Sequence, residues 1–189
     1  MNKAAWVGGL TLVLGASAAL ANGEQVEVCF NYGCIQQAPV VFDRMDLEPL
    51  ARRVAAAADA PAERAAVADA VGQLYRLAGQ QSPISSDRAG NLRDAGVHGR
   101  MDCIDHSRTT TRFLRLMEAR GWLQHHVVTE PARRTRFIFQ HFSAVLEERT
   151  QAEGEPEAYA IDSWFVEHGE PAVIVPLADW YRGEGPNVQ

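Results

Sequence analysis

Residues 136–164 have the sequence RFIFQHFSAVLEERTQAEGEPEAYAIDSW, and this stretch decides the fold. Its first part, residues 136–148, carries apolar side chains on both alternating faces, as is typical of a strand that lies inside a sheet with both faces covered. A second β-prone segment occupies residues 157–165, and only the polar residues 149–156 separate the two. We therefore predict an antiparallel hairpin at the centre of a sheet.

The hairpin predicts a specific pair of facing residues. A turn centred near residues 151 and 152 places His141 opposite Asp162, with their Cβ atoms about 5 Å apart. A buried histidine without a partner is costly, because its polar nitrogens lose their water. A facing carboxylate orients the ring and stabilises its charged form. This register therefore predicts a His141–Asp162 hydrogen bond, although a lone strand histidine or buried aspartate is more often structural.

A helix upstream places a thiol at its first turn. Asp102 is a good N-cap, and the predicted helix runs to Arg120, with Gly121 as the stop signal. Cys103 follows the cap directly, and the positive end of a helix favours thiolate and lowers the pKa of a thiol. The acids Asp102 and Asp105 oppose this effect. We expect Cys103 to be a nucleophile, with His141 as its cationic partner.

The other segments complete an α+β domain, in which helices come first and antiparallel strands follow. Apolar periodicity and breakers predict the following elements: strands over residues 25–30 and 38–42, helices over residues 47–58 and 61–78, a long connection over residues 80–101, and strands over residues 122–129 and 172–175. The predicted organisation is a single domain over residues 22–189.

The first 21 residues are typical of a secretory signal peptide. A basic start is followed by an apolar run over residues 4–20, and Ala19-Leu20-Ala21 supplies the small-x-small cleavage pattern. We expect a periplasmic or secreted protein with no stable membrane span, because the run is short and rich in Gly and Ala. A retained membrane anchor is the alternative.

Three cysteines in an oxidising compartment leave one unpaired. Cys29 and Cys34 flank a turn-forming interval, so we predict a disulfide between them. Two reduced thiols, a metal half-site and a redox pair are the alternatives. Cys103 is then the free thiol, either a nucleophile or an inert buried residue.

The charge balance excludes several functions. The formal net charge is −6, so binding of nucleic acid through the overall field is not expected. Lys3 is the only lysine of the chain. Catalysis by a lysine, as in Ser-Lys dyads, lysine Schiff bases and pyridoxal enzymes, is therefore excluded for residues 22–189.

Three short segments together resemble the transglutaminase-like superfamily. They are DCIDH at residues 102–106, HFSAV at residues 141–145 and AIDSW at residues 160–164, within a likeness that covers residues 74–164. The closest resemblance is to bacterial transglutaminase-like cysteine proteases, some of them periplasmic. It implies a papain/transglutaminase-like fold, in which a nucleophile helix packs on an antiparallel sheet, and a catalytic triad of Cys103, His141 and Asp162.

The resemblance implies acyl-transfer chemistry on amide bonds of a protein or peptide substrate, by a peptidase or amidase, with transamidation as a variant. The oxyanion hole would use the Cys103 N–H and an upstream donor, for which Asn91 and His98 are candidates. No cofactor is expected. The family pattern has Glu after the nucleophile and uses its acids for calcium, whereas this chain has Ile104, which argues against a calcium site.

Three alternatives remain open. Cys103 and His106 stand one helical turn apart and could begin a zinc site, but His125 and His126 point to opposite faces of a strand, so no metal site is expected. A non-enzymatic alternative is an exported binding domain that has the same fold but does not catalyse a reaction. A cell-wall amidase of the NlpC/P60 kind ranks lower, because Asp162 stands where that group usually has another residue.

Overall fold

The computed structural model describes residues 23–90, 93–149 and 156–186. It is mixed, with 38% of residues in helices and 28% in strands. The predicted signal peptide, residues 1–21, lies outside the described residues. Among the residues that are described, no helix combines the length and apolar character needed to cross a bilayer.

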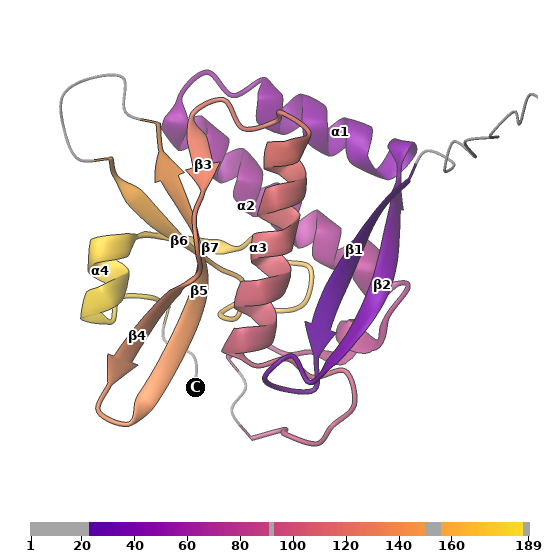
Figure 1. Cartoon of the computed structure of the whole chain (residues 1–189), viewed down its shortest axis with the longest axis vertical. Coiled ribbons are helices and arrows are strands. Elements are labelled where there is room, and N and C mark those ends of the chain that lie inside the picture. Colours follow the sequence, from indigo (N-terminus) through magenta and orange to yellow (C-terminus); the bar gives the residue numbers. More distant parts are fainter. Residues whose placement is uncertain (1–22, 91–92, 150–155, 187–189) are drawn as a thin grey trace, which may run out of the picture.

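The elements follow the predicted order: a first pair of strands, then helices, then the strands of the main sheet (Figure 1). They are β1 (Gly23–Phe30), β2 (Gln36–Asp43), α1 (Arg44–Ala55), α2 (Ala60–Gly79), η1 (Pro83–Ser86), α3 (Cys103–Ala119), β3 (His126–Val128), β4 (Ala132–Arg136), β5 (Phe139–Glu148), β6 (Ala158–Asp162), β7 (Val173–Pro176) and α4 (Leu177–Arg182). Every strand pairing among the described residues is antiparallel, so the α+β class is confirmed.

The β1–β2 hairpin is a two-stranded sheet of its own, separate from the main sheet. In β2 the fully buried Val40 and Phe42 alternate with exposed residues, whereas Val28 of β1 is followed by two more buried residues. The predicted disulfide between Cys29 and Cys34 closes its turn. Helix α3 lies between this hairpin and the main sheet and packs on both β1 and β5 (Figure 1).

The main sheet has the strand order β3-β5-β6-β7, with β4 paired to the first half of β5. The β5–β6 hairpin is present, but its register differs from the prediction by two residues. Ala144 pairs with Ile161, so Ser143 and not His141 is the position opposite Asp162. A shift of two residues keeps every side chain on its face. His141 and Asp162 thus remain diagonal neighbours on one side of the sheet.

The long strand predicted over residues 136–148 is in part wrong. A turn at residues 137 and 138 divides it, and Arg136 and Phe139 pair across that turn. Phe137, Ile138 and Phe139 are 95%, 86% and 70% exposed, so this part of the stretch is not covered on both faces. Three apolar residues and alternation cannot distinguish a buried strand from the end of a hairpin.

The two faces of the sheet have separate cores. The main core lies between the sheet, α3, α2 and the β1–β2 hairpin, and includes Ala144, Leu146 and Ile161. The opposite face holds a small cluster around Trp180, which comes from α4 and packs on Val145 and Ala160. Helix α4 has six residues and was not predicted, and β3 is shorter than the predicted strand over residues 122–129.

Candidate active site

His141 and Asp162 form the hydrogen bond that the sequence predicted. Nε2 of His141 lies 2.6 Å from Oδ2 of Asp162, and the carboxylate side chain is 1% exposed. Trp180 Nε1 donates to the same oxygen at 3.0 Å, and the backbone N–H of Trp164 donates to Oδ1 at 3.3 Å. The carboxylate is therefore fixed from three sides, and it directs the ring through Nε2.

Aromatic rings enclose the imidazole of His141. The ring centroids of Trp164, Phe165 and Trp180 lie 5.0, 5.3 and 5.7 Å from its own. Alternation along β5 places His141 on the same face as Val145, which is the face that α4 covers. The His141 side chain is 13% exposed, so the imidazole is oriented but still reachable from solvent.

The thiol of Cys103 lies against the backbone of β5 on both sides of His141. Its Sγ atom is 3.9 Å from the carbonyl oxygen of Gln140, and the N–H of Phe142 also bonds to it. Cys103 is the first residue of α3, as predicted. Strand β6 pairs with β5 only from Ala144 onward, which leaves this edge of β5 open to the thiol.

The hydrogen bond of the thiol goes to a carbonyl and not to the imidazole within the described residues. Because Nε2 of His141 is engaged by Asp162, Nδ1 is the ring nitrogen that remains for the thiol. Catalytic hydrogen bonds are often long or misaligned in the absence of substrate. The structure thus brings Cys103, His141 and Asp162 to one neighbourhood, but among the described residues it shows no hydrogen bond between the thiol and the imidazole.

The predicted lowering of the Cys103 pKa at the helix start is wrong for this structure. Burial raises the pKa of the thiol from 9.0 to about 11, and the carboxylates of Asp102 and Asp162 raise it further, against the lowering effect of the Phe142 N–H. Desolvation disfavours the charged thiolate, and the start of a helix favours it through a positive partial charge of about half an elementary charge. Here the effect of desolvation is the larger of the two. The resting thiol is therefore protonated at neutral pH.

The two acids beside the thiol hold the start of α3 in place. Asp102 caps the helix by accepting the N–H groups of Ile104 and Asp105, and the side chain of Asp105 accepts the N–H of Asp102 in return. Such a reciprocal capping box satisfies donors that the helix itself leaves free. Cys103 thus stands on a rigid first turn.

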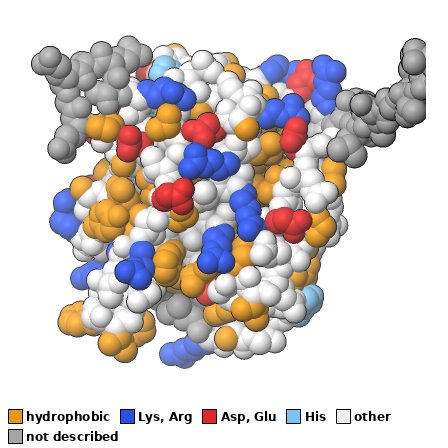
Figure 2. Space-filling model, viewed as in Figure 1, with side chains coloured by type: hydrophobic (Ala, Val, Ile, Leu, Met, Phe, Trp, Pro, Cys, Tyr) orange, Lys and Arg blue, Asp and Glu red, His pale blue; other side chains and the backbone are white. Residues whose placement is uncertain are grey.

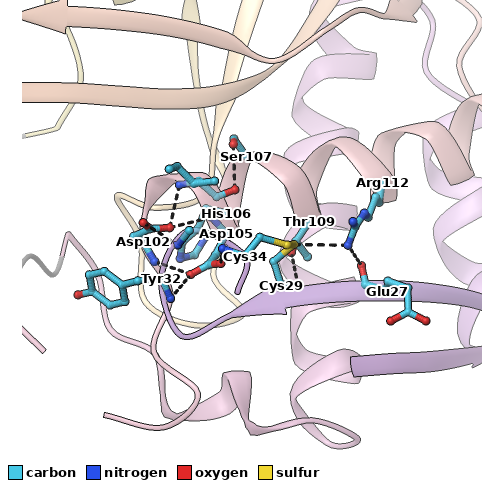
Figure 3. The surroundings of a disulfide bond; sticks show 12 residues. Glu27, Cys29, Tyr32, Cys34, Asp102, Asp105, His106, Ser107, Thr109 and Arg112 are labelled. Carbon is cyan, nitrogen blue, oxygen red and sulfur yellow. Dashed lines mark hydrogen bonds between the residues drawn. A yellow bond between two sulfur atoms is a disulfide. The ribbon is translucent and has the colours of Figure 1, made fainter. Parts of the chain in front are cut away.

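The disulfide loop clamps this first turn from the side (Figure 3). The carboxylate of Asp105 accepts the N–H groups of Tyr32 and Cys34 at 2.8 and 2.6 Å, and Asp102 accepts the N–H of Gly33 at 3.0 Å. Burial raises the pKa of Asp105 to about 6, against the lowering effect of these backbone donors. The disulfide therefore supports the position of Cys103.

A buried polar network that sequence analysis missed connects α3 to the end of β6. His106 lies between Asp87 and Ser163, with 2.8 Å from Nε2 to Asp87 Oδ2 and 2.8 Å from Nδ1 to Ser163 Oγ. The network continues from Ser163 to the hydroxyl group of Thr110, which in turn bonds to the hydroxyl group of Tyr75. His106 is only 4% exposed, and both of its ring nitrogens are hydrogen-bonded, so neither is free for a zinc site with Cys103. No spacing pattern linked Asp87 to this histidine.

The residues considered for metal binding are otherwise engaged. Cys29, Cys34 and Asp105 lie within 4.8 Å of one another, but the two sulfurs form the disulfide and have no thiolate to offer. The acid oxygens beside Cys103 accept backbone N–H groups, and such donors would face a cation unfavourably. The donor set therefore does not fit calcium.

The structure describes only one of the two predicted oxyanion donors. Asn91 lies outside the described residues. His98 is exposed, and its Nδ1 lies 3.3 Å from the amide of Asn31, which directs it to the disulfide loop. A donor that sequence analysis did not name is Trp164 Nε1, which is buried and lacks a hydrogen-bond partner among the described residues. A buried unpaired N–H calls for an explanation.

Comparison with known proteins adds no relative. No protein-family model matches the chain, and neither a curated protein nor a solved structure matches it. The function is therefore inferred from the geometry of the site and from the resemblance of its three short segments.

Proposed function

We propose that this chain is an exported, cysteine-dependent acyl-transfer enzyme that acts on amide bonds of protein or peptide substrates. The observation that carries the proposal is the hydrogen-bonded His141–Asp162 pair beside the thiol. The backbone groups that contact the Cys103 sulfur belong to Gln140 and Phe142, the residues on either side of His141. An oriented base beside a thiol on a helix start is the arrangement that nucleophilic catalysis requires.

In the first step, Nδ1 of His141 accepts the proton of the Cys103 thiol while the sulfur attacks the amide carbonyl carbon. Asp162 stabilises the imidazolium through Nε2. The tetrahedral intermediate collapses, the C–N bond breaks, and the imidazolium gives its proton to the leaving amine. A thioester remains on Cys103. Because the resting thiol is neutral, His141 acts as a general base during attack, and no thiolate–imidazolium pair precedes it.

In the second step, water replaces the amine. His141 removes a proton from the water, the hydroxide attacks the thioester, and the C–S bond breaks with return of the proton to the sulfur. The product is a carboxylate, as expected of a peptidase or amidase. An amine acceptor in place of water would give transamidation. The negative charge of each intermediate requires N–H donors, for which we assign the Cys103 backbone.

The disulfide supports the exported location, since such bonds persist in oxidising compartments. Asp162 as the third residue favours the transglutaminase-like type over the NlpC/P60 type. The alternative of a binding domain without turnover is favoured by two observations, the raised pKa of Cys103 and the thiol bond to Gln140 instead of the imidazole.

Substrate discovery tests the proposal. The wild-type chain and its Cys103→Ala variant are each incubated with a bacterial envelope extract, and mass spectrometry identifies new peptide termini and changed side-chain amides. We expect products that form with the wild type and are absent with Cys103→Ala and with His141→Ala. Circular dichroism confirms that each variant is folded. Identical product sets for all three proteins would favour the binding domain.

A further inference from the structure

Three adjacent apolar side chains project from the end of the β4–β5 hairpin. Phe137, Ile138 and Phe139, which we call the hairpin tip, have exposed fractions of 95%, 86% and 70%. The hairpin extends away from the body of the domain in Figure 1, and apolar side chains gather at its free end in Figure 2. Single exposed apolar residues are common, but a contiguous group on a protrusion marks an interaction site.

The backbone of the tip is also in an unfavourable conformation. Phe137 is the first central residue of the two-residue turn and has φ +54°, the left-handed region. In hairpin turns this position favours glycine, because a side chain crowds the backbone there. An aromatic residue at such a position, with its ring in solvent, stabilises neither the turn nor the core. Strain of this kind is typical of sites of function.

The strands that lead to the tip carry positive charge. Residues 131–146 contain three arginines and no Asp or Glu, within a chain of net charge −6. Arg134 is bound to the body of the protein, where it donates to the carbonyl of Trp180 and covers its ring. Arg133 and Arg136 are exposed, and within the described residues neither lies in an ion pair. The hairpin is thus apolar at its end and basic at its base.

This combination fits one occupant better than others. A convex apolar end can enter the acyl boundary of a bilayer, while arginines behind it meet lipid phosphates. A second copy of the chain would bring the same arginines face to face across a two-fold axis, which is unfavourable. We propose that the hairpin tip docks this protein on an anionic membrane surface, independently of whether it is an enzyme.

Docking would determine where the candidate active site lies. Phe139 and His141 are two residues apart on β5, which corresponds to about 7 Å along a strand. The thiol of Cys103 contacts the residue between them, Gln140. A membrane-bound tip therefore holds the Cys103–His141 pair next to the headgroups, facing substrates that are themselves at the membrane surface.

A local fluorescence probe tests the proposal in the full chain. In a Cys103→Ser background, Ile138→Cys is labelled with a nitrobenzoxadiazole dye, whose emission rises and shifts to the blue on entering lipid. The matched control carries the dye at Met45→Cys, a position 83% exposed at the start of α1. The apolar residues 4–20 are common to both proteins and can bring either to a vesicle, so only the local signal counts.

With vesicles of phosphatidylcholine and phosphatidylglycerol in equal parts, we expect the shift at position 138 and none at position 45. Pure phosphatidylcholine should give a weaker response. In the Ile138-labelled protein, Arg133→Gln should weaken the apparent affinity about fivefold and Phe137→Ser about tenfold or more. An unchanged spectrum at position 138 would overturn the proposal. A shift that depends on protein concentration without vesicles would assign the tip to a second copy instead.

Discussion

The pH dependence of Cys103 alkylation should show whether the thiol is protonated in the folded protein. Burial raises the pKa of this thiol from 9.0 to about 11, a difference of two units. Two units mean about a hundredfold less thiolate at any pH below 9. Since iodoacetamide reacts with the thiolate, the native protein should be alkylated at Cys103 about a hundredfold more slowly than the same chain unfolded in urea.

The assay is a rate measurement from about pH 7 to about pH 10, in which mass spectrometry quantifies the labelled Cys103 peptide without reduction of the disulfide. We expect the native rate to rise tenfold per pH unit over the whole range, and the unfolded rate to level off near pH 9. His141→Ala should leave the native rate nearly unchanged, because no ion pair is lost. A native rate that levels off below pH 8 and falls with His141→Ala would refute the reasoning.

The same raised pKa links stability to pH. The unfolded chain releases the Cys103 proton near pH 9 and the folded protein only near pH 11. Between these values the unfolded state binds fewer protons, so the free energy of unfolding falls as the pH rises. The contribution is fully present below pH 9. Urea unfolding of wild type and Cys103→Ala over this window should show a steeper loss for the wild type.

Two further perturbations have defined outcomes. Asp162→Asn should lower turnover on the identified substrate by about a thousandfold or more, through loss of ring orientation, whereas an unchanged rate would exclude Asp162 from the site. Cys29→Ser with Cys34→Ser should lower the free energy of unfolding by about 2 kcal/mol in urea titrations, since the closed loop is short. If this double variant unfolded at the same urea concentration as the wild type, the disulfide would contribute nothing to stability.

Local patterns were enough to predict the elements around the site. The N-cap at Asp102, the disulfide and the β5–β6 hairpin all follow from residues close in the chain. The predicted register was two residues off, because the sequence does not specify how long the connection between Glu148 and Ala158 is or where its centre lies. The His141–Asp162 contact was nevertheless predicted, since side chains two residues apart share a face.

The parts that were missed depend on contacts between distant residues. The buried network of His106 was not predicted, because its partners Asp87 and Ser163 lie 19 and 57 positions away and no local pattern links them to it. The raised pKa of Cys103 is likewise a result of packing against β5. Local sequence patterns predicted that Cys103 lies at a helix start, but only the fold shows that its sulfur is removed from water.

The proposed role of His141 as the base that accepts the Cys103 proton is tested most directly with a small activated ester. p-Nitrophenyl acetate needs no specificity pocket, and acetylation of Cys103 is followed by release of nitrophenol and by intact mass. We predict that native wild type is acetylated faster than the unfolded chain despite its raised thiol pKa, and that His141→Ala lowers the rate about a hundredfold or more. Equal rates for wild type and His141→Ala in the folded state would contradict the account.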